Sequence, residues 1–159
     1  MNQCLNGAGE KLADLMIQSD YALDQKNSLR FMETKDGKQA IYAKTRKDWR
    51  TWLSQNSQTE KSVWLILYHK KSEVASVNLV EATEEALCFG WIDSLCKKRD
   101  AESYYLTFSH RNPKTSKWSK PNRERAERMI KENLMTEFGQ KLIDIAKATG
   151  KWEPTDTEK

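Results

Sequence analysis

The chain of 159 residues is long enough for one domain, and its 38% hydrophobic content with a mean hydropathy of −0.85 indicates a polar but globular protein. Six Trp, five Tyr and four Phe supply enough apolar area for a packed core. No run approaches the roughly 18 apolar residues of a membrane span, and the N-terminus does not resemble a signal peptide. Because the three cysteines are odd in number and lack CxxC spacing, we expect a cytoplasmic protein without disulfides, metal or cofactor.

The net charge of +4 is distributed unevenly along the chain. Residues 97–131 contain eleven Lys or Arg against four acidic residues, so the remainder is slightly negative. Such a stretch can attract an anionic partner, nucleic acid included. The alternative, which we favour, is a solvated face whose charges pair along one helix, as Glu124 with Arg128 and Glu127 with Lys131 would at i,i+4 spacing.

The first 38 residues are predicted to be a partly ordered extension. Leu12, Leu15 and Met16 suggest a short amphipathic helix, although glycine-containing segments interrupt this part of the chain. We place a single domain at 39–152 and a disordered tail at 153–159.

The domain begins with a predicted helix and a predicted strand. The helix is predicted over 46–55 and follows Thr45, which with Asp48 resembles a capping box that has Asp in place of Glu. The continuous apolar run over 63–68 is typical of a buried strand.

The eight residues ALCFGWID at 86–93 join a second helix to a second strand. The helix is predicted over 79–89, with Asn78 as its N-cap and Leu79 on its inner side. Gly90 ends this helix, because the left-handed conformation of a helix C-terminus is most accessible to glycine.

The remaining elements complete an α+β fold. Strands over 91–99 and 103–109 form an antiparallel hairpin, which joins the strand at 63–68 in a small antiparallel sheet. Two further helices are predicted over 120–132 and 137–149, so that about four helices pack with the sheet.

The sequence contains no known motif that identifies its chemistry: it has no phosphate-binding loop, metal-ligand motif or nucleophile elbow. Asp93 is left as a charge at the edge of the predicted core, where it needs a partner or a function. The loop that follows the strand at 103–109 carries polar and aromatic side chains that can face it. The candidate ligand-binding residues are Trp91, Asp93, Arg111, Ser116, Trp118, Ser119 and Asn122.

Two interpretations of Asp93 stay open. In the structural one, Asp93 accepts hydrogen bonds from Arg111 or from loop hydroxyls and pins the loop to the strand. In the functional one, Trp91 and Trp118 floor a polar pocket in which Arg111 recognises an anion. Asp93 is the candidate acid or base if the protein is an enzyme.

Several short motifs follow one another in a specific order. They are Trp49 with Trp52-Leu53, Val63-Trp64-Leu65, ALCFGWID at 86–93, Arg111 with Ser116-Lys117-Trp118-Ser119 and Asn122, Met135-Thr136, Gly139, Ala146-Lys147 and Gly150-Lys151-Trp152. In this order the chain resembles the YdeI/OmpD-associated family, also labelled bacteriocin-protection proteins, over residues 41–152. It departs from the family pattern at His110-Arg111, where the family usually has Pro-Arg.

The resemblance implies a small α+β domain and a link to resistance against bacteriocins or antimicrobial peptides, but it implies no catalytic mechanism. We therefore expect a ligand-binding or stress-protection protein whose ligand is small or peptidic and anionic. The alternatives are a small-molecule enzyme using Asp93 and Arg111, and a nucleic-acid-binding module using the basic stretch 97–131.

Overall fold

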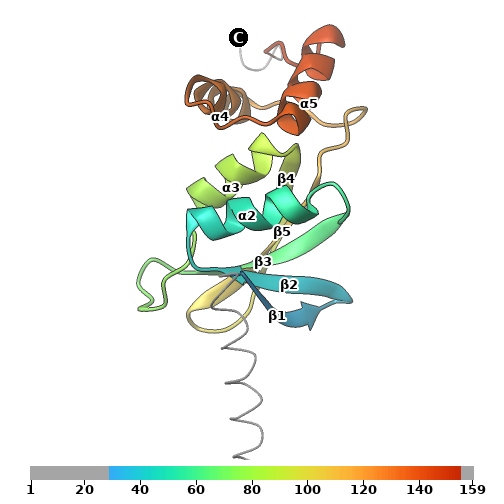
Figure 1. Cartoon of the computed structure of the whole chain (residues 1–159). Coiled ribbons are helices and arrows are strands. Elements are labelled where there is room, and N and C mark those ends of the chain that lie inside the picture. Colours follow the sequence, from blue (N-terminus) through green and yellow to red (C-terminus); the bar gives the residue numbers. More distant parts are fainter. Residues whose placement is uncertain (1–28, 155–159) are drawn as a thin grey trace, which may run out of the picture.

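The structure is a computed structural model that describes residues 29–154. Two helices pack on one face of a five-stranded sheet, and two further helices are stacked beyond them (Figure 1). The elements in chain order are β1 (Leu29–Lys35), β2 (Lys38–Ala43), α2 (Arg46–Asn56), β3 (Ser62–Tyr68), α3 (Leu79–Cys88), β4 (Trp91–Lys98), β5 (Ser103–His110), α4 (Lys120–Lys131) and α5 (Glu137–Ala148). None of the described helices is long and apolar enough to cross a membrane. The helix predicted near Leu12 and residues 155–159 of the predicted tail lie outside the described part of the chain.

The expected α+β fold is confirmed, although the sheet is larger than expected and is not purely antiparallel. Every helix and strand predicted within the domain lies within one residue of its predicted bounds. The strand order is β1-β2-β3-β5-β4, and β2 runs parallel to β3 with Ala40 opposite Trp64. The two strands that were not predicted, β1 and β2, therefore make the sheet mixed.

A two-residue turn explains why β1 and β2 form a hairpin. Asp36 and Gly37 both have positive φ, 51° and 73°, as the central residues of a type I′ turn require. Asp-Gly is a favoured sequence for this turn, whose twist matches that of antiparallel strands. The hairpin places β1 in the sheet from Leu29 onward, ten residues before the expected start of the domain at Gln39.

Aromatic side chains fill the core between the sheet and the helices α2 and α3. The rings of Trp49 and Trp52 stack at 5.4 Å, and Trp49 also contacts Phe108 of β5. The buried indole N–H of Trp49 donates to the carbonyl of Ala82, and that of Trp91 donates to the carbonyl of Ser57. The core is therefore apolar without leaving these indole donors unpaired.

Two glycines let α5 approach the end of α3. Gly90 has φ of +78°, and a Cβ atom there would lie 2.9 Å from Leu142 Cδ1. At Gly139 a Cβ atom would lie 2.5 Å from the carbonyl oxygen of Cys88. The backbone N–H of Thr136 donates to that same carbonyl, so the ALCFGWID turn is the platform on which α5 sits.

Ion pairs join strands that lie at opposite ends of the sheet order. Arg99, just after β4, donates to Glu33 of β1 at 2.9 Å, and Lys97 of β4 pairs with Asp36 at 2.8 Å. The sheet is thus curled so that its two edges meet through side chains.

Candidate functional site

The site predicted from sequence is built around a buried arginine. Arg111 follows β5, and its backbone N–H donates to the carbonyl of Gly90 at 2.9 Å. Its guanidinium lies over the ring of Trp118 at 4.0 Å from the centroid, and Nη1 donates to the carbonyl of Lys117 at 3.1 Å. The residue is only 3% exposed. The structure therefore brings Arg111 and Trp118 together as one rigid unit.

Contacts with other residues also hold Trp118 in place. Its ring packs against Trp152 at 5.0 Å, and both belong to a small core under α4 and α5. Lys151 donates to the carbonyls of Pro113 and Lys114, which ties the loop to the end of α5. Consequently the loop that carries Trp118 is anchored at both sides of the arginine.

The guanidinium of Arg111 has no carboxylate partner within the described residues. No ion pair of 4.0 Å or less joins it to an Asp or Glu there. Burial lowers the pKa of Arg111 to about 10, and the charge of Asp93 opposes that shift. Arg111 is therefore cationic at neutral pH although most of its surface is buried.

The two remaining guanidinium nitrogens of Arg111 reach solvent. Nε and Nη2 make no hydrogen bond in residues 29–154. In the same residues, the polar side-chain atoms that are fully enclosed and lack a hydrogen-bond partner are Thr107 Oγ1 and Arg125 Nε. Because Nε and Nη2 of Arg111 lack a partner and are not among these atoms, they are not fully enclosed. The small exposed surface of Arg111 is thus at N–H groups that can still donate.

The other predicted site residues differ in burial and in hydrogen bonding. Asp93 is half-buried on β4, and its carboxylate makes no hydrogen bond or ion pair with the described residues. Trp91 is 1% exposed and lies inside the main core. Ser119 is the exposed N-cap of α4 and makes no side-chain cap hydrogen bond. Asn122 accepts from Arg125, and Ser116 is half-buried in the loop.

A cleft of about 800 Å³ lies elsewhere on the molecule and was not predicted. It is formed by loop 69–78 and the start of α3, and we call it the α3 cleft; its lining is Arg46, Tyr68, His69, Lys70, Ser72, Val74, Ala75, Ser76, Asn78, Leu79, Val80, Glu81, Glu84 and Tyr104. Leu79, expected on the inner side of its helix, is 47% exposed there. The ring of His69 packs against that of Tyr104 with centroids 5.1 Å apart, and both residues line the cleft.

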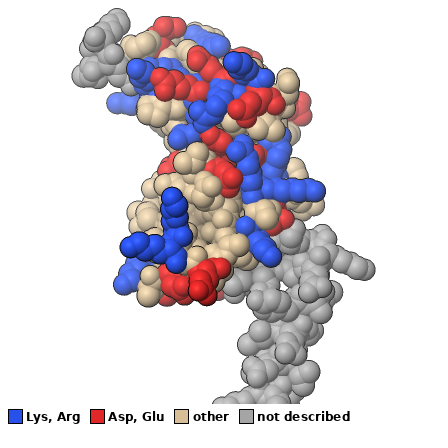
Figure 2. Space-filling model, turned by 90° about the vertical axis from the view of Figure 1, so that its left-hand side faces the viewer, with Lys and Arg blue, Asp and Glu red and all other residues tan. Residues whose placement is uncertain are grey.

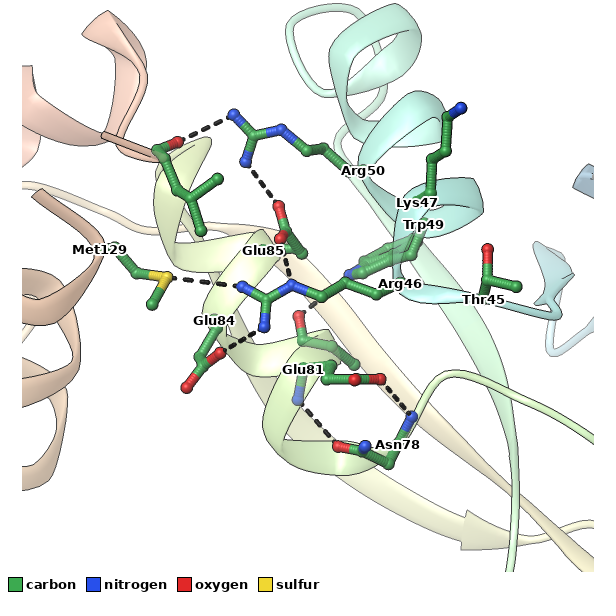
Figure 3. Close-up of polar contacts among 12 residues, drawn as sticks. Thr45, Arg46, Lys47, Trp49, Arg50, Asn78, Glu81, Glu84, Glu85 and Met129 are labelled. Carbon is green, nitrogen blue, oxygen red and sulfur yellow. Dashed lines mark hydrogen bonds and ion pairs between the residues drawn. The ribbon is translucent and has the colours of Figure 1, made fainter. Parts of the chain in front are cut away.

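Two residues that line the α3 cleft, Arg46 and Glu84, belong to a network of ion pairs that joins α2, α3 and α4. Figure 3 shows the pairs between α2 and α3. Arg46 donates to Glu84 at 2.8 Å and to Glu85 at 2.6 Å, while Arg50 donates to Glu85 at 2.6 Å. Arg128 of α4 also pairs with Glu84. The expected i,i+4 partnership of Arg128 is therefore replaced by a contact with another helix.

The basic stretch 97–131 is largely used inside the fold. Lys97 and Arg99 pair with β1 and its turn, Arg111 stacks on an indole, and Arg128 pairs with Glu84. Several of its cations therefore hold structure, which favours the solvated and structural interpretation over a phosphate-binding stripe. Within residues 29–154 no group of three or more His, Cys, Asp or Glu could hold a metal ion.

Comparison with known proteins adds one assignment. A family model described as a domain of unknown function, DUF8412, matches residues 41–142. This chain belongs to the DUF8412 family. No curated protein and no solved structure matches it. In this DUF8412 protein the matched range contains Arg111, Trp118 and Asp93 as well as the whole α3 cleft.

Proposed function

We propose that this DUF8412 protein is a binding protein that holds a peptidic ligand by its terminal carboxylate at Arg111. The observation that supports this proposal is a buried arginine, 3% exposed as a residue, whose guanidinium lacks a carboxylate partner in the described chain. A buried charge is costly unless it is paired, so such a group is a natural site for an anion from outside.

The surroundings of Arg111 favour a carboxylate. Trp118 and the carbonyl of Lys117 hold the planar guanidinium in one orientation, and its remaining N–H groups can donate to an oxyanion. Charge-assisted hydrogen bonds of this kind are about twice as strong as neutral ones. Because the arginine is already ordered, little side-chain entropy is lost when the ligand binds.

Asp93 narrows the class of ligand. Its negative charge interacts with Arg111, and its carboxylate still has acceptor capacity because no described residue donates to it. A polyanion would be repelled by this carboxylate. A ligand with one anionic group beside an N–H donor, as at the C-terminus of a peptide, satisfies both residues.

Peptide pools can test this proposal. A pool of random hexapeptides with free C-terminal carboxylates and the same pool with amidated C-termini should be compared for retention on the immobilised protein. We expect at least tenfold stronger retention of the free acids, as a charge-assisted hydrogen bond of roughly 1.5–3 kcal/mol implies. Arg111→Gln should remove the preference, while the loop variant Lys117→Gln should preserve it.

A second variant separates binding from a merely structural role. Asp93→Asn, at a half-buried position without a partner in the described chain, should keep the melting temperature and relax the discrimination against ligands that carry a second negative charge, because the repelling carboxylate is removed. Equal retention of acids and amides by the unmodified protein would refute the proposal. In that case a large fall in melting temperature of Arg111→Gln would identify Arg111 as a loop anchor alone.

The biological role that we propose rests on the resemblance to the YdeI/OmpD-associated family. The ligand is then an antimicrobial peptide or a fragment of one, and the protein protects the cell that makes it. Deletion of the gene should lower the concentration at which bacteriocins or cationic peptides inhibit growth. Unchanged susceptibility across a panel of such peptides would contradict this role.

A further inference from the structure

The α3 cleft combines an apolar wall with a preformed shape. Of the six exposed large apolar side chains in the described residues, three line it: Val74, Leu79 and Val80, at 41%, 47% and 56% exposure. Figure 2 views the molecule from the side on which loop 69–78 lies, and there uncharged atoms occupy the middle of the face while charged side chains border it. Apolar groups gathered in one concave place commonly mark a binding site.

Hydrogen bonds hold the loop that forms the cleft. The backbone N–H of Tyr68 donates to Ser76 Oγ at 3.0 Å, and that of Val77 donates to the carbonyl of Ala43 at 3.0 Å. The hydroxyl of Tyr42 donates to the carbonyl of Ala75. The start of α3 is fixed in turn by the capping box of Asn78 and Glu81 (Figure 3). The cleft is therefore ordered before any ligand enters.

The charged residues that line the cleft are two cations, Arg46 and Lys70, and two anions, Glu81 and Glu84. Arg46 is already paired with Glu84, and both oxygens of Glu84 accept from arginines. The carboxylate of Glu81 accepts from the backbone N–H of Asn78 in the capping box. Lys70 makes no ion pair within residues 29–154. A bound group is thus favoured if it carries a single negative charge.

We propose that the α3 cleft binds an amphipathic monoanion, a small molecule with an aliphatic or aromatic body and one acidic group. The body lies against Val74, Leu79 and Val80, and the acidic group lies toward Lys70. A volume of about 800 Å³ is within the range of pockets that enclose small molecules, roughly 300–1,000 Å³. This site is separate from Arg111 and does not depend on the peptide-binding proposal.

Calorimetry with decanoate, and with decanol as its uncharged counterpart, tests the inference. We expect saturable binding of decanoate at least tenfold tighter than that of decanol. Leu79→Asp and Val80→Asp should each weaken decanoate binding at least tenfold, because they place a like charge on the apolar wall. Leu95→Asp is the matched control, since Leu95 is 52% exposed on β4 and does not line the cleft.

Two further variants test where the acidic group binds and whether the α3 cleft is independent of the Arg111 site. Lys70→Gln should weaken decanoate binding and leave decanol binding unchanged, while Arg111→Gln should change neither. Circular dichroism checks that each variant is folded. The inference is overturned if decanoate shows no saturable binding, if decanol binds equally well, if Leu95→Asp weakens binding as much as Leu79→Asp, or if Arg111→Gln alone abolishes it.

Discussion

Gly139 is a position where one added methyl group should strongly destabilise the fold. Glycine inside a helix is ordinarily unfavourable, so an exposed Gly→Ala change in a helix stabilises by about 1 kcal/mol. Gly139 lies in the first turn of α5 and is buried against the end of α3. The contact geometry therefore predicts that Gly139→Ala lowers the free energy of unfolding instead of raising it.

The magnitude follows from three short contacts. A Cβ atom at position 139 would lie 2.5 Å from the carbonyl oxygen of Cys88, 2.5 Å from Met135 Sδ and 2.7 Å from the carbonyl oxygen of Leu87. Two of these are backbone atoms, so α5 must move, at a cost of about 3 kcal/mol for overpacking. The shift also weakens the hydrogen bonds of Thr136 to Cys88, for about 1 kcal/mol. After subtracting about 1 kcal/mol for helix propensity, a net loss of about 3 kcal/mol remains.

Thermal and urea denaturation followed by circular dichroism measure this loss. For a chain of this size, about 3 kcal/mol corresponds to a melting temperature lower by roughly 6–12 °C. Lys141→Ala, at an exposed position of the same helix, is the control and should stay within about 0.5 kcal/mol of the unmodified protein. A Gly139→Ala variant as stable as the control, or more stable, would refute the close approach of α5 to the ALCFGWID turn.

Three other predictions concern charges and thiols. Glu85→Ala should lower the free energy of unfolding by about 2–3 kcal/mol, because it leaves Arg50 without its carboxylate and Arg46 with Glu84 alone; a loss below about 1 kcal/mol in urea denaturation would contradict this. A hydrogen bond from Arg99 lowers the pKa of Glu33 below 4.5, so the ion pair stabilises the fold above pH 4.5 and this contribution is lost as the pH falls through the lowered pKa. Arg99→Gln should accordingly make the fall of stability below pH 4.5 shallower, and an unchanged acid profile would count against the pair. Burial raises the pKa of Cys88 to about 12, so iodoacetamide at pH 8 should modify the exposed Cys96 and spare Cys88 until the protein is unfolded, as peptide mapping can show.

Local signals in the sequence predicted most of the helices and strands correctly. Thr45 with Asp48 and Asn78 with Glu81 form the two capping boxes that those residues predict. Gly90 has the positive φ expected of a residue that ends a helix. Such signals succeed because a cap or a turn depends on residues only a few positions apart.

Sequence reasoning missed one local hairpin and several features that depend on distant partners. Asp36-Gly37 carries a hairpin signal, but the strand on either side lacks a clear alternation, so β1 and β2 were not predicted. Leu79 was expected to face inward from its helical spacing, yet the path of loop 69–78 leaves it in a cleft. The proximity of Arg111 and Trp118 was anticipated as one hypothesis, whereas the absence of a carboxylate near the guanidinium requires the folded structure.

The ion-pair network that includes Arg46 and Glu84 of the α3 cleft also bears on the rates of folding and unfolding. Its hydrogen bonds join residues that are 35 to 84 positions apart, so they form only after most of the chain is in place. Interactions absent from the folding transition state slow unfolding without accelerating folding. The network should therefore contribute mainly to kinetic persistence: once folded, this protein is expected to open slowly, and the loss of Glu85 should shorten its native-state lifetime more than it delays refolding.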